Sequence, residues 1–215
     1  MEKNLPFDSH VAEYDAWFDH HPGIFQSELA AIKQQWPVKD NIVSLEIGAA
    51  TGRFAKELNI TEGIEPSINM ASVAKERGVS IWRGKAESLP YGDLEFDVVL
   101  MNDCISYLDK PDRSIIEAYK VLRYGGSLLI GFIVKGSLIG NYYESNHNDS
   151  VFYQDARFFS VNEVEEMVKA AGFKHLSFTQ TLFNSYEQST DTESVLAGCN
   201  KGSYVLLKAL KPVLG

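Results

Sequence analysis

A carboxylate and a cluster of very small residues stand where the first strongly apolar run of the chain turns into helix-like sequence. The stretch 44-SLEIGAATGRFA-55 places Glu46 just before this cluster, which consists of Gly48, Ala49, Ala50 and Gly52. Residues without bulk let a ligand press against the backbone, or let the backbone turn through positive φ. The cluster is therefore either a binding loop or a tight strand-to-helix turn.

A second carboxylate favours the binding loop. Glu65 ends the next strand-like run, nineteen positions after Glu46. A fixed carboxylate there can accept hydrogen bonds from both hydroxyls of a ribose. The stretch 84-GKAESLP-90 follows a third strand-like run, and its backbone together with Glu87 could meet the edge of a base. The three stretches together predict a nucleoside site.

The glycine spacing disfavours a dinucleotide site. A loop that holds a pyrophosphate needs G-x-G-x-x-G, whose third glycine packs the helix closely. Counted from Gly48, this chain has Ala50 at the second glycine position and Arg53 at the third. An NAD-dependent oxidoreductase is therefore the weakest of the alternatives that remain.

The composition indicates a soluble protein with one sizeable core. The chain has 215 residues and a net charge of −9 from 29 acidic and 20 basic residues, which disfavours a nucleic-acid partner. Cys104 and Cys199 lie far apart without metal-ligand spacing, so we expect no metal and a reduced, cytoplasmic environment. The N-terminus does not read as a signal peptide, and no apolar run approaches the ~20 residues that span a membrane, so we expect no membrane partner.

Strand-like and helix-like runs alternate from residue 42 to 172. The strand-like runs are 42–48, 60–66, 79–84, 96–102 and 126–134, and the helix-like runs between and after them are 53–59, 67–78, 111–123 and 160–172. This alternation indicates βαβ units around a parallel sheet. Two further strand-like runs, 174–183 and 203–210, have no helix between them and should pair antiparallel. We predict an α/β fold: a doubly wound, mostly parallel seven-stranded sheet with helices on both faces and an antiparallel C-terminal hairpin at the edge.

Two segments flank this core within the single predicted domain, residues 1–215. Helices predicted over 7–19 and 23–36 form an N-terminal helical cap, residues 1–37. Residues 136–159 are polar, aromatic and long for a connection, and such segments are either lids or disordered. We predict a lid loop there.

The order of the motifs resembles that of the class I, Rossmann-like S-adenosylmethionine-dependent methyltransferases of the small-molecule type. Motif I of that family, acidic-x-G-x-G-x-G, corresponds to Glu46, Gly48, Ala50 and Gly52. The further matching stretches are 63-GIEPSINM-70, 84-GKAESLPY-91, 96-FDVVLMNDCISYL-108, 117-EAYKVLRYGGSLLIGF-132 and 158-FFSVNEVEEMVKAAGF-173. Together they span residues 44–173 in the family's order.

The resemblance implies S-adenosyl-L-methionine as cofactor and S-adenosyl-L-homocysteine as product. It implies that residues 48–52 pass the methionine moiety, that Glu46 faces its ammonium directly or through water, and that Glu65 takes the ribose hydroxyls. It further implies adenine contacts for Pro66, Ser67, Ala86 and Glu87, and a place near the sulfonium for Asn102, Asp103 and Cys104. Two positions depart from the family pattern. Ala50 replaces the commonest middle glycine of motif I. Lys85 stands where many relatives have an acidic residue that contacts the adenine amine, so either Glu87 or backbone groups recognise the adenine.

The predicted partner is a small-molecule methyl acceptor, whose nucleophile is N, O, S or C. The aromatic candidates for its pocket are Tyr14, Trp17, Tyr107, Tyr142 and Tyr143, which would suit a small organic acceptor and a cationic amine through cation–π contact. No catalytic residue is assigned, but a base for an oxygen or carbon acceptor could be Asp103, His21 or His147. We expect the N-terminal helix and the 136–159 segment to close over the site as a mobile lid. A cofactor-binding regulatory or scaffold protein without turnover is the main alternative.

Overall fold

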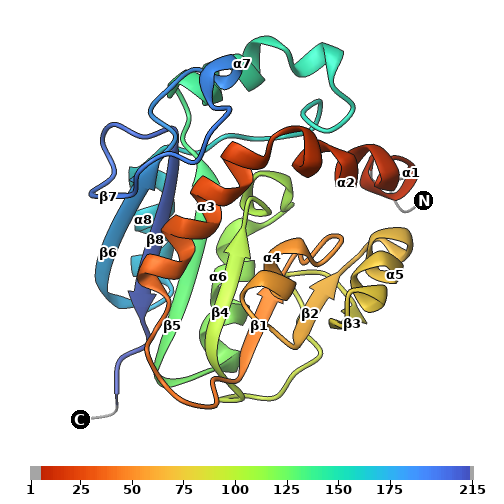
Figure 1. Ribbon diagram of the computed structural model, residues 1–215. Coiled ribbons are helices and arrows are strands. Elements are labelled where there is room, and N and C mark those ends of the chain that lie inside the picture. The colour runs from red at the N-terminus through yellow and green to blue at the C-terminus, as the bar shows by residue number, and fades with distance from the viewer. Residues whose placement is uncertain (1–5, 214–215) are drawn as a thin grey trace.

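One mixed sheet runs through the computed structural model, which describes residues 6–213 (Figure 1). Its strands are β1 (Ser44–Ile47), β2 (Glu62–Glu65), β3 (Ser80–Arg83), β4 (Phe96–Asn102), β5 (Leu122–Ile133), β6 (Lys174–Thr181), β7 (Leu196–Ala197) and β8 (Tyr204–Leu210). They lie in the order β3-β2-β1-β4-β5-β8-β6-β7, in which β1 to β5 are parallel and β8 is antiparallel to both β5 and β6. The chain order reverses between β1 and β4, and ligands of doubly wound sheets bind beyond the carboxyl ends of strands at such a point.

The predicted fold class and the antiparallel hairpin are confirmed, but the number of strands is wrong. The sheet has eight strands rather than seven. The additional strand, β7, has two residues and pairs with Thr179 and Gln180 at the edge of the sheet. A pairing this short leaves no alternating pattern in the sequence, which is why the segment was predicted as polar loop.

Helices cover both faces of the sheet, as predicted. They are α1 (Pro6–Ser9), α2 (Val11–His20), α3 (Pro22–Gln35), α4 (Arg53–Glu57), α5 (Ile68–Glu76), α6 (Pro111–Val121), α7 (Leu138–Ser145) and α8 (Val161–Ala170), with 3₁₀ turns η1 (Ile105–Tyr107), η2 (His147–Asp149) and η3 (Tyr186–Gln188). Successive residues of β4 alternate between two cores: Val98 packs with α2 to α5, and Val99 packs with α6 and α8. This period of two follows from the strand geometry.

The helix starts that position the site follow ordinary capping chemistry. The Ser67 hydroxyl accepts a hydrogen bond from the Met70 N–H at 3.1 Å and so caps α5 directly after β2. Ser160 and Glu163 form the predicted capping box of α8. These caps fix where each helix leaves the sheet.

The two flanking segments differ from their predicted form. The helix predicted over 7–19 is divided into α1 and α2, and the part of the predicted cap in residues 1–5 lies outside the described residues. The predicted 136–159 loop contains α7, which Ser137 caps through the Gly140 N–H and which buries Ile139 and Tyr143. Within residues 6–213, no helix has the length and apolar character of a membrane span.

Candidate active site

A cavity of about 760 Å³ opens at the carboxyl ends of β1, β2 and β4. The helices α1 and α2 lie across these strand ends in Figure 1. The predicted site residues that line the cavity are Tyr14, Trp17, Gly48, Ala50, Glu65, Pro66, Ser67, Ala86, Glu87, Asn102, Asp103, Cys104, Tyr107 and Tyr143. The volume lies within the range of about 300–1,000 Å³ that is typical of small-molecule sites.

The small-residue loop is both a tight turn and a wall of the cavity. Gly48, Ala50 and Gly52 have φ of +73°, +46° and +77°, so the left-handed conformation alternates along the loop. The N–H groups of Gly48 and Ala49 both donate to the Ile64 carbonyl, at 2.9 and 3.0 Å, which folds the loop over the end of β2. A Cβ atom added to Gly48 would lie 2.6 Å from Cβ of Cys104. Only glycine fits there.

The other small residues of the loop have different surroundings. Ala49 lines a separate chamber beside Glu46. Gly52 lines neither space, since it is the N-cap of α4 and a Cβ there would meet Ala74 at 3.0 Å. The structure uses Gly52 for a close approach between α4 and α5, and its predicted cofactor contact stays a prediction.

Glu65 lies where a ribose carboxylate is predicted. Its Oε2 accepts the Ala50 N–H at 2.9 Å and its Oε1 accepts the Ser67 N–H at 2.8 Å. Each oxygen has a second lone pair, so the carboxylate can still accept two hydroxyl groups from the cavity that it lines. Burial raises the pKa of Glu65 to about 7, and the two backbone donors oppose this shift. The backbone thus fixes the carboxylate before any ligand binds.

Glu46 has an unused acceptor in a buried position. Its Oε2 is buried without a hydrogen-bond partner, and the carboxylate lines a chamber of about 30 Å³ together with Ala49 and Phe54. Burial raises the pKa of Glu46 to about 8. A buried acceptor without a donor costs about 1–3 kcal/mol, so a small cationic donor in this chamber would be stabilised. This chemistry fits the ammonium of the cofactor that the resemblance implies.

The wall near residues 84–90 offers fewer free polar groups. Glu87 lines the cavity, but its Oε1 also accepts the Lys110 N–H at 3.2 Å. Lys85 lines the same wall, and a lysine has no lone pair with which to accept a bond from an adenine amine. Adenine contacts of Ala86, Glu87 and the backbone remain a prediction.

Beyond the end of β4, two carboxyl groups meet. Asp103 lies in the left-handed region, with φ of +51°, and its Oδ2 accepts a hydrogen bond from Asn102 Nδ2 at 3.1 Å. Glu28 of α3 lines the same cavity, is only 4% exposed, and forms a hydrogen bond with Asp103. Glu28 was not among the predicted site residues, although it lies on the apolar stripe of its helix between Phe25 and Ile32.

Of the three candidate bases, only Asp103 lines the cavity. The two ring nitrogens of His21 are engaged with the Trp17 carbonyl at 2.9 Å and the Tyr186 hydroxyl at 2.7 Å. His147 lies on the surface against the Glu144 carbonyl. Burial raises the pKa of the Cys104 thiol, which keeps it protonated and unreactive. The two histidines are therefore not candidates for the base.

Four of the five predicted aromatic residues line the cavity, and Tyr142 does not. Tyr142 stacks on Tyr186, with ring centroids 4.4 Å apart. Several aromatic residues that were not predicted as site residues also line the cavity, namely Phe7, Phe18, Phe152, Tyr153 and Phe158. The walls at this end are thus formed by aromatic rings around the carboxyl pair.

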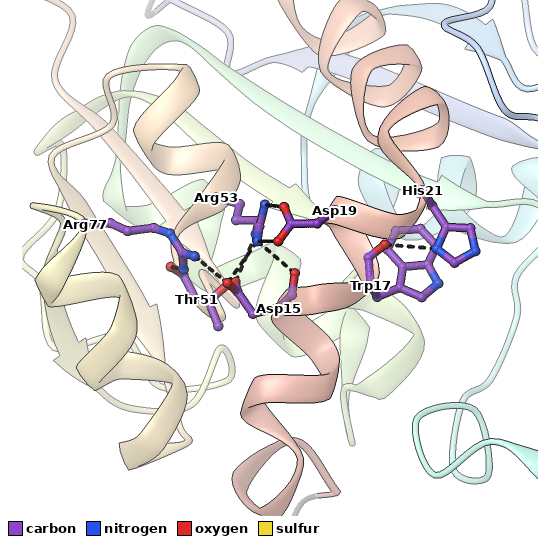
Figure 2. Close-up of polar contacts among 7 residues, drawn as sticks. All are labelled: Asp15, Trp17, Asp19, His21, Thr51, Arg53 and Arg77. Carbon is purple, nitrogen blue, oxygen red and sulfur yellow. Dashed lines mark hydrogen bonds and ion pairs between the residues drawn. The ribbon is translucent and has the colours of Figure 1, made fainter.

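An ion-pair network fastens the cap to the loop (Figure 2). The Asp15 carboxylate of α2 accepts hydrogen bonds from Arg53, Arg77 and the Thr51 hydroxyl, at 2.9, 2.5 and 2.7 Å. Arg53 also pairs with Asp19 at 2.8 Å. These bonds hold the pKa of Asp15 well below its usual range against the effect of burial. Arg53 stands where a dinucleotide-binding loop would have its third glycine, and its side chain holds the cap in place.

Comparison with known proteins agrees with this geometry. A family model for a methyltransferase domain matches residues 45–130. An uncharacterized protein of Methanocaldococcus jannaschii is 41% identical over 95% of this chain and 98% of its own length. The crystal structure of a SAM-dependent methyltransferase from Thermotoga maritima, described as a possible histamine N-methyltransferase, superposes with a TM-score of 0.91 at 40% identity, over 96% of this chain and 98% of that chain.

The fold is also shared with a phosphoethanolamine N-methyltransferase 2 of Haemonchus contortus in complex with S-adenosyl-L-methionine. This structure superposes with a TM-score of 0.63 at 19% identity, over 86% of this chain and 52% of that chain. Within residues 6–213, no group of three or more His, Cys, Asp or Glu side chains could hold a metal ion. The 40% identity over nearly the whole length of the Thermotoga maritima structure, together with the methyltransferase-domain match over residues 45–130, leads to one assignment. The chain belongs to the class I family of S-adenosylmethionine-dependent methyltransferases.

Proposed function

We propose that the protein binds S-adenosyl-L-methionine in the 760 Å³ cavity and transfers its methyl group to a small-molecule acceptor in the same cavity. The proposal rests above all on one observation. The Glu65 carboxylate, with its free lone pairs, and the Asp103–Glu28 pair line a single continuous space. A ribose group at one end and an acceptor at the other would therefore be enclosed together.

The chain's own residues supply binding and orientation. Glu65 takes the ribose hydroxyls, Glu46 takes the ammonium of the methionine moiety, and the wall around Ile64 and Met70 packs against the base. The bound cofactor supplies a methyl group on positively charged sulfur, so that transfer is an in-line displacement in which the carbon–sulfur bond breaks with its electron pair left on sulfur. Holding an acceptor in line can lower the barrier by up to about 10 kcal/mol.

The cover of the cavity supports a small acceptor. The helix α1 is tied to α5, because the Ser67 hydroxyl donates to the Asp8 carboxylate at 2.6 Å, and α2 is tied to the loop by Arg53 and Arg77. A polymer would have to displace these helices. The net charge of −9 further disfavours a nucleic-acid acceptor.

The names of the relatives support both nitrogen and oxygen acceptors. The Thermotoga maritima protein is described as a possible histamine N-methyltransferase, and the Haemonchus contortus protein as a phosphoethanolamine N-methyltransferase. More distant relatives, such as one from Methylococcus capsulatus at 25% identity, are malonyl-[acyl-carrier protein] O-methyltransferases. The family alone does not choose the acceptor atom.

Calorimetry with S-adenosyl-L-homocysteine tests the proposed cofactor. We expect a dissociation constant in the micromolar range, which corresponds to about −8 kcal/mol. NADH is the matched control, because it also carries an adenosine but adds a pyrophosphate that this loop does not fit. Absence of S-adenosyl-L-homocysteine binding would contradict the proposal. Binding without release of the demethylated product, over a panel of small amines, alcohols and thiols, would favour a regulatory or scaffold protein.

A further inference from the structure

Two carboxyl groups from distant parts of the chain, the buried Glu28 and the half-buried Asp103, meet in the cavity. Glu28 lies on α3, which packs against β5, β6 and β8, and Asp103 follows β4. Glu28 is 4% exposed, and both side chains line the cavity and form a hydrogen bond with each other. Burying two acids together is unfavourable unless a partner compensates for it. The pair therefore needs a function that a neutral residue would not serve.

The groups that act most strongly on the pair are neutral or acidic. The negative charge of Asp103 or Glu28 raises the pKa of six neighbouring groups. These are Tyr14 of α2, Cys104, Tyr107 of η1, Tyr143 of α7, Tyr153 and Tyr204 of β8. Glu46, from β1, faces Tyr14, Cys104 and Tyr204 as well. Arg83 and Lys85 line the cavity too, but at the ends of β2 and β3 rather than beside the pair. Arg53 lines the small chamber that Asp103 also lines, but its guanidinium is paired with Asp15 and Asp19. The other titratable neighbours of the pair named here are neutral or acidic.

Aromatic faces complete the surroundings. Tyr14, Tyr107, Tyr143 and Tyr153 line the cavity beside the pair, as does Phe158. Aromatic rings attract cations through the negative face of the π system, and the attraction is stronger where water is excluded. Acids and rings therefore favour the same kind of ligand at this place.

We propose that Glu28 and Asp103 bind the ammonium group of a protonated amine, and that this amine is the methyl acceptor of the proposed function. Asp103, as the charged member of the pair, accepts one proton from the ammonium, which leaves the nitrogen with a free lone pair and Asp103 as the neutral acid. Glu28 stays protonated and donates its hydrogen bond to Asp103. Asp103 later releases the proton to water, so that the pair returns to its starting state.

The surroundings of the two acids decide which of them carries the proton. Burial raises the pKa of Glu28 well above its usual range, and the neighbouring Asp103 raises it further. Burial also raises the pKa of Asp103, whereas the hydrogen bonds from Glu28 and Asn102 oppose the rise. Glu28 therefore keeps the proton and Asp103 takes the charge. An acid with a pKa nearer neutrality is also the better proton acceptor for an amine.

Matched pairs of probes test the charge requirement directly. With saturating S-adenosyl-L-homocysteine present, calorimetry compares three amines with their alcohols: propylamine with 1-propanol, 2-phenylethylamine with 2-phenylethanol, and 1,4-diaminobutane with 1,4-butanediol. We expect at least one amine to bind tenfold or more tightly than its alcohol, a difference of about 1.4 kcal/mol. In Asp103→Asn, which removes the charged member of the pair, and in Glu28→Ala, which removes the hydrogen bond donated to Asp103, this preference should fall below threefold.

Two further variants separate a binding role from a structural one. Glu28→Asp keeps the acid on a shorter side chain and should restore part of the amine preference, which a purely structural carboxyl would not show. Glu166→Gln removes an exposed acid of α8 outside the cavity and should retain the full preference. Melting temperatures report whether each variant is folded.

Each outcome decides a different point. Equal binding of amine and alcohol in all three pairs, or a preference that survives in the double variant Glu28→Gln/Asp103→Asn, would overturn the inference while leaving the proposed function intact. Loss of S-adenosyl-L-homocysteine binding by the unaltered protein would instead overturn the proposed function. S-adenosyl-L-homocysteine should bind the control variant Glu166→Gln within threefold of its affinity for the unaltered protein, because Glu166 is exposed and lies outside the cavity.

Discussion

Around Glu65 the cavity is formed mainly by backbone, whereas around Asp103 it is formed by side chains. The Glu65 region uses residues 48–52 and 65–67, which are the ends of two adjacent strands, and its hydrogen bonds come from main-chain N–H groups. The Asp103 region brings together side chains of α2, α3, η1 and α7. A substitution can change the shape of the Asp103 region at any of its side chains. In the Glu65 region a substitution changes the shape only at the few positions where an added Cβ would meet another atom. This difference would let one cofactor site accompany many acceptors.

The largest expected effect is at Gly48, in the backbone region. A Cβ there meets Cys104 at 2.6 Å, and φ of +73° disfavours any L side chain. We expect Gly48→Val to abolish S-adenosyl-L-homocysteine binding at every concentration that calorimetry reaches. Because the branched side chain cannot be placed without moving Cys104, we also expect the melting temperature to fall by several degrees.

Gly78 provides the matched control for this prediction. It also has positive φ, +90°, but a Cβ there has no neighbour within 4 Å. Gly78→Val should therefore lose about 1–2 kcal/mol of folding free energy through backbone strain alone and keep its affinity for S-adenosyl-L-homocysteine. Equal affinities of the two variants would mean that the loop is only a structural turn.

The next largest effect is expected at Glu65, whose side chain lies at the centre of the backbone region. Glu65→Ala removes the proposed acceptor for two ribose hydroxyls and frees the N–H groups of Ala50 and Ser67. We expect calorimetry to show a loss of about 2–4 kcal/mol in S-adenosyl-L-homocysteine binding. An unchanged dissociation constant in a folded variant would remove the ribose assignment.

The same division explains what could be predicted from the sequence. The sheet, the loop and the Glu65 site depend on residues close together in the chain, where small residues, caps and strand ends leave a local pattern. Glu28 and Asp103 are 75 positions apart, and only the packing of α3 over the sheet brings them together. An acid on the apolar stripe of a helix was the only signal for Glu28, and a solvated surface charge is the more frequent cause of such a pattern.

Other misses have the same origin. Asp15 and Arg53 are 38 positions apart, so their ion pair could not be deduced from helix periodicity. The helix α7 was predicted as loop because residues 140–149 are rich in polar and aromatic types, although Ile139 and Tyr143 have the i, i+4 spacing of a buried face. Tyr142 was assigned to the pocket by residue type alone, and its ring stacks on Tyr186 instead.

The buried acids of the backbone region should make the free protein less stable as pH rises. Burial raises the pKa of Glu65 to about 7 and of Glu46 to about 8, above the values near 4.5 of an unfolded chain. Between about pH 5 and pH 8 the folded state therefore binds more protons than the unfolded state, and the free energy of unfolding falls with pH. Asp15, whose pKa is lowered, is fully ionised throughout this window.

We expect a loss of about 1–3 kcal/mol across this window, measured by chemical denaturation at pH 5 and pH 8. Glu46→Gln should flatten the dependence, because its amide does not titrate. Saturating S-adenosyl-L-homocysteine should reduce it as well, since an ammonium near Glu46 favours the ionised form. Stability that rises from pH 5 to pH 8 would contradict the proposed state of both acids.

The ion pairs of Asp15 in Figure 2 hold α2 over the cavity more firmly than α7 is held. The ion pairs of Asp15 tie α2 down, whereas α7 contacts η3 through aromatic rings: Tyr142 stacks on Tyr186, and Tyr143 meets Tyr186 edge-to-face. We therefore expect hydrogen exchange to protect residues 11–20 even without ligand, and residues 138–158 to gain protection when S-adenosyl-L-homocysteine and an amine bind together. Equal exchange of 138–158 in both states would mean that no lid closes.

Asp15→Ala should sharpen this contrast. It leaves Arg53 and Arg77 without their shared carboxylate, and we expect a loss of about 1–2 kcal/mol in folding free energy, since the partly exposed pairs are screened by water. Hydrogen exchange of residues 11–20 should become faster. Asp155→Ala, at an exposed position, is the control and should leave exchange in 11–20 unchanged.

The smallest expected effect concerns two neighbouring alanines of the loop, for which the backbone predicts changes of opposite sign. Ala50 has φ of +46°, where glycine is favoured, so Ala50→Gly should relieve strain and stabilise the protein by about 0.5–1 kcal/mol in chemical denaturation. Ala49 has no such conformation, and its Cβ would lie 2.8 Å from a Cβ at Gly63, which shows how closely it packs on β2. Ala49→Gly should therefore destabilise by about 1 kcal/mol, through a lost buried methyl and a freer unfolded chain.

Because the Ala50 N–H already donates to Glu65 in this strained conformation, Ala50→Gly should leave the affinity for S-adenosyl-L-homocysteine within about threefold of its present value. A clear gain in affinity would indicate that the alanine methyl holds the loop away from the ligand, as its place at the commonest middle glycine of the family suggests. A loss of stability in Ala50→Gly would show that the methyl contributes packing on the cavity wall that outweighs the backbone strain.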